Sequence, residues 1–154
     1  MTETAHTRTI SGMLEVFADG GSRGNPGHAA YAFIVKKDDQ IIKEGKGYIG
    51  ITTNNVAEYT ALIEALKWLS NNYAAQNLQI SLDSQLVVSQ LNGIFKVKDS
   101  KIRDLFFKVR ELEPNFPKLI YKHIPRQQNS QADKLVNTVL DEVTLSASSK
   151  YHGT

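Results

Sequence analysis

The spacing of apolar residues predicts strands in the first third of the chain. Residues Met13 to Asp19 alternate apolar and polar side chains and are rich in strand-forming types, which is typical of a half-buried strand. Residues 28–37 and 40–50 have the same character, and Asp38-Asp39 between them predicts a turn. Four glycines and a proline between Gly20 and Gly27 predict a loop between the first two strands. We therefore expect an antiparallel meander of three strands.

The rest of the chain alternates helical and strand-like patterns. Apolar residues at helical spacing, such as Leu62, Ala65 and Leu66, predict a long helix that ends near Asn71-Asn72. Further segments are predicted as strands over 78–83 and 118–124, and as helices over 84–91, 98–112 and about 130–145. Because helices separate the later strands, the connections predict right-handed parallel crossovers. The expected fold class is α/β, with a mixed five-stranded sheet flanked by helices.

Length, charge and cysteine content narrow the classes of protein to consider. The 154 residues suit one domain over 12–145, with a flexible tail over 1–11 and a second tail over 146–154. The formal net charge of +2 excludes a protein that binds nucleic acid simply through a large positive excess. No cysteine is present to form a disulfide or a thiolate zinc site. No apolar run approaches the ~20 residues of a membrane span, and we expect a cytoplasmic protein.

Four carboxylates occupy positions that suggest a metal site. Asp19 lies at the end of the first predicted strand and Asp83 at the end of the fourth. If these two strands are parallel neighbours, both carboxylates emerge at the same edge of the sheet. Glu58 and Asp133 lie in the first turns of helices, on the apolar stripe of each. Taken singly, each residue also has a simpler role as a cap or as a charge that complements the helix dipole. Oxygen ligands that converge without Cys suit Mg²⁺ or Mn²⁺, and two such ions can support phosphodiester hydrolysis.

The chain resembles type 1 ribonuclease H, the family that cuts the RNA strand of RNA/DNA hybrids. The resemblance rests on four motifs in family order, FADGGSRGNPG (17–27), TTNNVAEYTALIEAL (52–66), LDSQLVV (82–88) and HIPRQQNSQADKLVN (123–137). It implies a ribonuclease H-like fold in which strands 4 and 5 run parallel to strand 1. It also implies a monomer with no obligatory protein partner and no membrane association.

The same resemblance implies an active site with two divalent ions, Mg²⁺ or Mn²⁺. In this arrangement Asp19 bridges both ions, Glu58 and Asp83 hold the ion near the leaving 3′-oxygen, and Asp133 holds the ion that carries the attacking water. The products would be a 3′-hydroxyl and a 5′-phosphate. Two further residues compete for a role beside the water. His123 has the spacing of a proton carrier, whereas the HIPR motif resembles a subgroup in which an arginine, here Arg126, takes that place and acts through its charge.

Recognition of the hybrid is expected to depend on its shape and its 2′-hydroxyls, which an A-form duplex displays in a wide minor groove. Amide side chains can both donate to and accept from these groups, and glycine backbone can approach them closely. The family positions that match are Gly20, Asn25, Asn54, Asn55 and Gln85. Asn54 is also a candidate helix cap and Asn25 a candidate turn former.

Many family members carry a basic, Trp-rich insertion after the helix that follows the fourth strand, and we expect this insertion to be absent here. Residues 96–110 still carry six basic and two acidic side chains, which indicates either a solvated helix face or a shortened surface for the DNA strand. Two other functions compete with hybrid cleavage. One is cleavage of another nucleic acid, such as double-stranded RNA, and the other is hybrid binding without catalysis.

Overall fold

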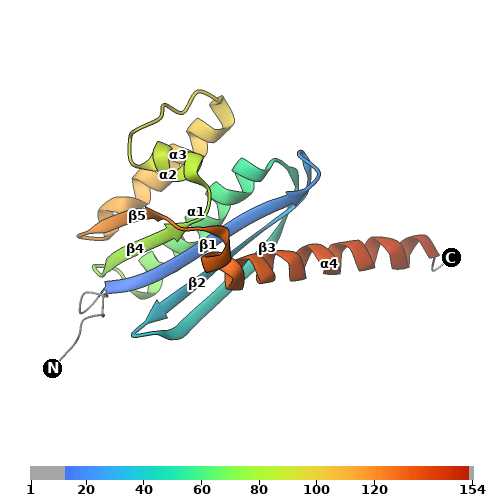
Figure 1. Cartoon of the computed structure of the whole chain (residues 1–154), viewed down its shortest axis with the longest axis horizontal. Coiled ribbons are helices and arrows are strands. Elements are labelled where there is room, and N and C mark those ends of the chain that lie inside the picture. Colours follow the sequence, from blue (N-terminus) through green and yellow to red (C-terminus); the bar gives the residue numbers. More distant parts are fainter. Residues whose placement is uncertain (1–12, 153–154) are drawn as a thin grey trace.

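A mixed five-stranded sheet forms the centre of the molecule. The structure is a computed structural model that describes residues 13–152. Its strands, in chain order, are β1 (Met13–Arg23), β2 (Gly27–Lys37), β3 (Gln40–Thr52), β4 (Asn77–Leu82) and β5 (Leu119–His123). They lie in the order β3-β2-β1-β4-β5, with β1, β2 and β3 antiparallel and with β4 and β5 parallel to β1 (Figure 1). This is the predicted fold.

Four α-helices and two short 3-10 helices connect and cover these strands. They are α1 (Asn54–Asn72), α2 (Gln85–Leu91), α3 (Ser100–Leu112), η1 (Glu113–Asn115), η2 (Arg126–Asn129) and α4 (Ser130–His152). Three helices begin at side-chain caps, with Thr53, Ser84 and Asp99 each accepting a hydrogen bond from a backbone N–H of the first turn. None of the helices within residues 13–152 is long and apolar enough to pass through a membrane.

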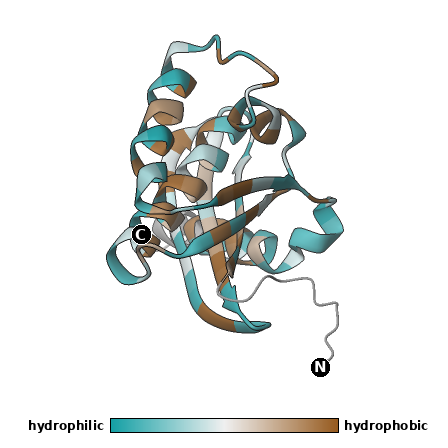
Figure 2. Ribbon diagram, turned by 90° about the vertical axis from the view of Figure 1, so that its left-hand side faces the viewer, coloured by the Kyte–Doolittle hydropathy of each residue, from teal (hydrophilic) through white to brown (hydrophobic). Residues whose placement is uncertain are grey.

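The two faces of the sheet are covered by different helices. Helix α1 packs on one face, where its leucines meet alternate residues of β1 and β2 such as Val16 and Val35, and α3 packs against α1. Helix α4 covers the other face, where Val136 and Leu140 pack against Ala30 and Ala32 of β2. Figure 2 shows that apolar residues occur along the strands and at intervals along the helices. The structure therefore contains one large core under α1 and a smaller one under α4.

The connection between β1 and β2 is shorter than the sequence predicts. Residues 20–27 are expected as a loop, but the turn covers only 24–26. Gly20 and Gly21 pair with Tyr31 and Ala30 across the hairpin. The prediction was wrong because glycine weakens a strand without preventing it when both neighbouring backbones are already paired. Asp38 and Asp39, by contrast, form the predicted turn, with φ angles of 51° and 65°.

The last helix is longer than predicted. Its expected end is near Leu145, but α4 continues to His152, so residues expected as part of a tail are helical. The reason is that no Gly or Pro interrupts residues 130–152, and helices end most readily at these two types. The tail expected over 1–11 lies outside the described residues.

Candidate metal centre and substrate cleft

The register of the parallel strands brings Asp19 and Asp83 together. Ala18 of β1 pairs with Leu82 of β4, so the residues that follow, Asp19 and Asp83, lie at the same level, where the pairing of the two strands ends. Asp19 is only 6% exposed, and β1 continues past it to Arg23 because β2 still provides a partner strand. Asp83 lies between the end of β4 and the Ser84 cap of α2. The prediction of adjacent carboxylates is thus realised through the β1–β4 pairing.

Glu58 reaches this edge because α1 approaches β1 very closely at Gly20. A Cβ atom at Gly20 would overlap the backbone of Ala57 and would lie within 2.5 Å of the Glu58 nitrogen. Only a residue without a side chain allows this approach. Gly20 was expected to face the substrate, and it does line the cleft, but its backbone is buried against α1. Its position accounts for the proximity of Glu58 to Asp19.

Asp19, Glu58 and Asp83 form a tight acidic cluster. One carboxylate oxygen from each of them lies within 4.8 Å of the others. Burial, together with the negative charges of Asp83 and Asp133, raises the pKa of Asp19 to about 8. Burial, together with the negative charges of Asp19 and Asp83, raises the pKa of Glu58 to about 9. The cluster therefore opposes full ionisation unless a cation is close by.

Asp133 and Arg126 complete the surroundings of Asp19. Asp133 lies in the first turn of α4 and is half-buried, and its charge acts on Asp19. The positive charge of Arg126, the first residue of η2, lowers the pKa of both Asp19 and Glu58. Asp19, Glu58, Asp133 and Arg126 all line one cleft of about 380 Å³. The predicted carboxylates thus converge around Asp19. Two arginines, Arg23 and Arg126, line the same cleft, and Arg126 is the one whose charge acts on Asp19 and Glu58.

The donor set fits a hard divalent cation. The Oε1 atom of Glu58 is buried and has no hydrogen-bond partner among the described residues. A buried, unpaired carboxylate oxygen is costly in a protein, and a metal ion would satisfy it. Because every converging ligand is a carboxylate, the site suits Mg²⁺ or Mn²⁺ better than Zn²⁺.

Asn129 is part of the site and was not predicted. It is 1% exposed, and its Nδ2 atom donates to the backbone oxygen of Ala18 at 2.8 Å and to Oδ2 of Asp83 at 2.9 Å. The only feature of the sequence that points to Asn129 as a site residue is its place in a polar motif, four residues before Asp133. That signal does not reveal the partners, because they lie on distant strands.

The two candidates for an assisting role occupy different places. His123 is exposed at the end of β5, where it pairs with Leu82 of β4. Among the described residues that line the cleft, Arg126 is present and His123 is absent.

The hairpin turn and the start of α1 are joined by the predicted amide residues. Oδ1 of Asn25 accepts from the backbone N–H of Asn54 at 3.0 Å. Oδ1 of Asn54 accepts from the backbone N–H of Ser22 at 2.8 Å and from its hydroxyl at 3.1 Å. Thr53, and not Asn54, is the helix cap. Both side-chain oxygens are therefore engaged within the protein, and Asn54 lines the cleft.

The other predicted contact residues lie on the surface. Asn55 is exposed on the first turn of α1, and Gln85 is exposed at the start of α2. In the basic segment over 96–110, Arg110 has a structural role, because its guanidinium donates to Glu113 and to the backbone oxygen of Leu91, each at 2.7 Å. The five remaining basic residues of this segment are exposed, namely Lys96, Lys98, Lys101, Arg103 and Lys108.

Comparison with known proteins shows what this chain is similar to. Residues 17–139 match the family model described as "Reverse transcriptase-like". The chain is 40% identical over 132 residues to "Ribonuclease HI" of Halobacterium salinarum, covering 85% of this chain and 66% of that protein. It also resembles the structure of an RNase H1, isolated from compost by a metagenomic approach, in complex with an RNA/DNA hybrid. That similarity has a TM-score of 0.81 and 37% identity, and it covers 85% of this chain and 99% of the other.

The similarity extends to part of a larger protein. A bifunctional protein of Mycobacterium tuberculosis is 40% identical over 132 residues, which is 84% of this chain but only 36% of that protein.

Proposed function

Because the chain belongs to the type 1 ribonuclease H family, we propose that it is an endoribonuclease that hydrolyses the RNA strand of RNA/DNA hybrids with the help of divalent metal ions. The cluster of Asp19, Glu58 and Asp83 carries the proposal. Each of the three carboxylates places an oxygen within 4.8 Å of the others, and Oε1 of Glu58 is buried with no hydrogen-bond partner in the described part of the chain. These side chains are best explained as ligands of a cation.

Asp19 is central to the proposed division of labour. One of its oxygens lies within 4.8 Å of an oxygen of Glu58 and of Asp83, and the negative charge of Asp133 raises its pKa. Asp19 would therefore be shared between two ions. Glu58 and Asp83 would hold one Mg²⁺ or Mn²⁺ ion, and Asp133 would hold the other. When bound, two such ions activate water and stabilise charge on the leaving oxygen, which would yield a 3′-hydroxyl and a 5′-phosphate.

Arg126 is the side chain that we propose to assist this reaction by its charge. It lines the cleft with three of the carboxylates, and an arginine stays protonated at neutral pH. It therefore stabilises ionised carboxylates before the ions bind and would attract a substrate phosphate afterwards. His123 remains the alternative for this role, as a proton carrier.

The amides at the edge of the cleft support recognition of the hybrid. The side-chain oxygens of Asn25 and Asn54 accept hydrogen bonds from the protein, which leaves their NH₂ groups to donate to a substrate. We propose that these groups donate to 2′-hydroxyls and base edges in the minor groove, together with exposed Asn55 and Gln85. Recognition would then be independent of base sequence. We further propose that the protein acts as a monomer.

The proposal is tested by the choice of substrate and by one substitution. Uniform RNA/DNA, RNA/RNA and DNA/DNA duplexes are incubated with the protein and either Mg²⁺ or Mn²⁺, and the products are sized. Only the RNA of the hybrid should be cut. Asp19→Asn should abolish cleavage but keep most of the hybrid affinity, because that affinity rests mainly on phosphate contacts.

Asp39→Asn is a matched control for that variant. Asp39 lies at the β2–β3 turn with φ 65°, a conformation that asparagine tolerates, and it is outside the cleft. The Asp39→Asn variant should cleave the hybrid like the wild type. Equal cleavage by Asp19→Asn would contradict the assignment of the metal site, and binding without cleavage in both metals would indicate a non-catalytic hybrid-binding module.

A further inference from the structure

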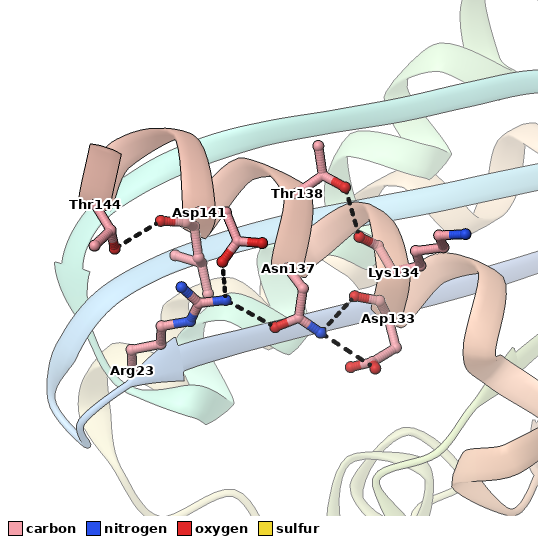
Figure 3. Close-up of polar contacts among 8 residues, drawn as sticks. Arg23, Asp133, Lys134, Asn137, Thr138, Asp141 and Thr144 are labelled. Carbon is pink, nitrogen blue, oxygen red and sulfur yellow. Dashed lines mark hydrogen bonds and ion pairs between the residues drawn. The ribbon is translucent and has the colours of Figure 1, made fainter. Parts of the chain in front are cut away.

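Polar side chains connect the end of β1 to Asp133 across the first turns of α4 (Figure 3). Nη2 of Arg23 lies 2.8 Å from Oδ1 of Asp141 and donates to Oδ1 of Asn137 at 3.2 Å. Nδ2 of Asn137 donates in turn to Oδ2 of Asp133 at 3.3 Å and to the backbone oxygen of Asp133 at 3.1 Å. One amide thus lies between a guanidinium and a carboxylate of the cleft.

The chemistry of the three groups allows only one orientation of this amide. A guanidinium can only donate hydrogen bonds, and an ionised carboxylate can only accept them. The Asn137 oxygen must therefore face Arg23, and its NH₂ group must face Asp133. A flipped amide would place NH₂ against the guanidinium and oxygen against the carboxylate, so both hydrogen bonds would be lost. Arg23, held by Asp141, thus supports the same orientation of Asn137 that the two acceptors of Asp133 require.

We propose that Asn137 and Arg23 are positioning residues that orient the Asp133 carboxylate for metal binding. The proposal rests on the function proposed above, in which Asp133 is a ligand. With its Oδ2 atom held by Asn137, the Asp133 carboxylate cannot rotate freely, and it stays beside Asp19, with which it would share the ion. Hydrogen-bond partners of this kind typically change metal affinity or activity by about 10–100-fold when removed.

A purely structural role is separable from this one. Arg23, Asn137 and Asp141 are all exposed, and the Arg23–Asp141 pair has side chains that are 42% and 64% accessible. Exposed ion pairs of this kind contribute little to folding. Loss of Arg23 or Asn137 should therefore leave the melting temperature almost unchanged, while metal binding weakens.

The test is calorimetric titration of the full chain with Mn²⁺ alone, together with kcat and KM for hybrid cleavage. Asn137→Ala should weaken Mn²⁺ binding about tenfold at the site that contains Asp133, and should lower kcat more than it raises KM. Arg23→Ala should show a smaller loss in the same direction, and Arg23→Lys should recover part of it. The double variant should resemble Asn137→Ala, because two residues in one hydrogen-bond chain are not additive.

Thr138→Ala is the matched control on the same helix. The Thr138 hydroxyl donates only to the backbone oxygen of Lys134, at 2.9 Å, so this variant should bind Mn²⁺ and cleave like the wild type. The proposal is overturned if Arg23→Ala raises KM for the hybrid at unchanged Mn²⁺ affinity, because Arg23 would then contact a substrate phosphate. It is also overturned if wild type binds Mn²⁺ and cleaves while Asn137→Ala does both equally well. Failure of the wild type itself to bind Mn²⁺ and to cleave would instead refute the proposed function.

Discussion

Asn129 holds Asp83 in place through a hydrogen bond of 2.9 Å from its side-chain nitrogen to Oδ2 of the carboxylate. The same nitrogen donates to the backbone oxygen of Ala18 at 2.8 Å, directly before Asp19. One buried amide in η2 therefore joins the ends of two parallel strand segments at the point where the carboxylates converge. We therefore expect Asn129 to affect both the stability of the fold and metal binding.

Replacing Asn129 with alanine should reduce the stability of the protein and its metal affinity together. One buried acceptor, the backbone oxygen of Ala18, and one half-buried acceptor, the Asp83 carboxylate, would lose their donor. The free energy of unfolding should therefore fall by about 1–3 kcal/mol. Since Asp83 would no longer be oriented, Mn²⁺ affinity should fall roughly 10–100-fold. Urea unfolding without metal and calorimetric titration with Mn²⁺ measure the two effects. Asn115→Ala is the control, because Asn115 donates to the hydroxyl of Ser70 outside the cleft. If both variants behaved alike, Asn129 would have no special role.

Two adjacent glycines offer a comparison of close packing. Gly20→Ala would force a methyl group into the backbone of Ala57, whereas a Cβ atom at Gly21 would meet its nearest neighbour, Val136, at 3.7 Å. Gly20→Ala should therefore destabilise the protein by about 1–3 kcal/mol or more and displace Glu58 from the cluster. Gly21→Ala should change stability by less than about 0.5 kcal/mol. Thermal unfolding and Mn²⁺ titration of both variants check this, and equal losses would contradict the close approach of α1 to β1.

The stability of the metal-free protein should decrease as the pH rises. Asp19 and Glu58 have pKa values of about 8 and about 9 in the folded state, against ordinary values of 3.8 and 4.5. At pH values between the ordinary and the raised pKa of each residue, the folded state binds more protons than the unfolded state. The free energy of unfolding therefore falls as the pH rises through this range. Saturating Mg²⁺ should offset the fall, because the ion stabilises the ionised carboxylates. Urea unfolding at a series of pH values, with Mg²⁺ or with a chelator, measures both slopes.

Glu58→Gln controls for that pH dependence. The amide has nearly the same shape as the carboxyl group but does not titrate in this range. In the presence of a chelator, this variant should lose less stability than the wild type as the pH rises to about 9. It should also bind Mg²⁺ more weakly. An identical pH slope for variant and wild type would show that Glu58 does not carry a raised pKa.

Arg126 and His123 should differ in their importance for cleavage. Arg126→Ala removes the positive charge that acts on Asp19 and Glu58, so kcat/KM should fall by about 100-fold. Because Arg126 lowers the pKa of Asp19 and Glu58, its loss should also move the rise of activity with pH to higher pH. Arg126→Lys should restore part of the activity. His123→Ala should stay within about threefold of the wild type in kcat/KM, and the opposite ranking would assign the assisting role to His123.

The elements of the fold were predictable where local patterns carry the information. Asp38-Asp39 identifies the β2–β3 turn, and Ser84 identifies the start of α2, because these side chains act on neighbouring backbone. The β1–β2 turn was misplaced for the opposite reason. A glycine beside other glycines predicts a loop, but Gly20 lies in β1, where its lack of a side chain lets α1 pack closely against the strand.

The site was predictable to the same extent. Glu58 and Asp133 stand out because a charged residue on an apolar stripe needs a partner, and Asp19 and Asp83 stand out at strand ends. Asn129 and Asn137 do not stand out, since an asparagine in a polar segment has many roles. Their importance depends on what they contact.

The sequence by itself determined the order of the strands and helices, the four carboxylates and the family, because periodicity, caps and motifs are local properties of the chain. Only the tertiary structure decided how the carboxylates are held. Asn129 meets Ala18 across 111 residues of sequence, and Arg23 meets Asn137 across 114. Contacts over such distances depend on the strand register and on the packing of α4 against the sheet. No local pattern encodes them, because a hydrogen bond is specific to the geometry of its two groups and not to their positions in the sequence.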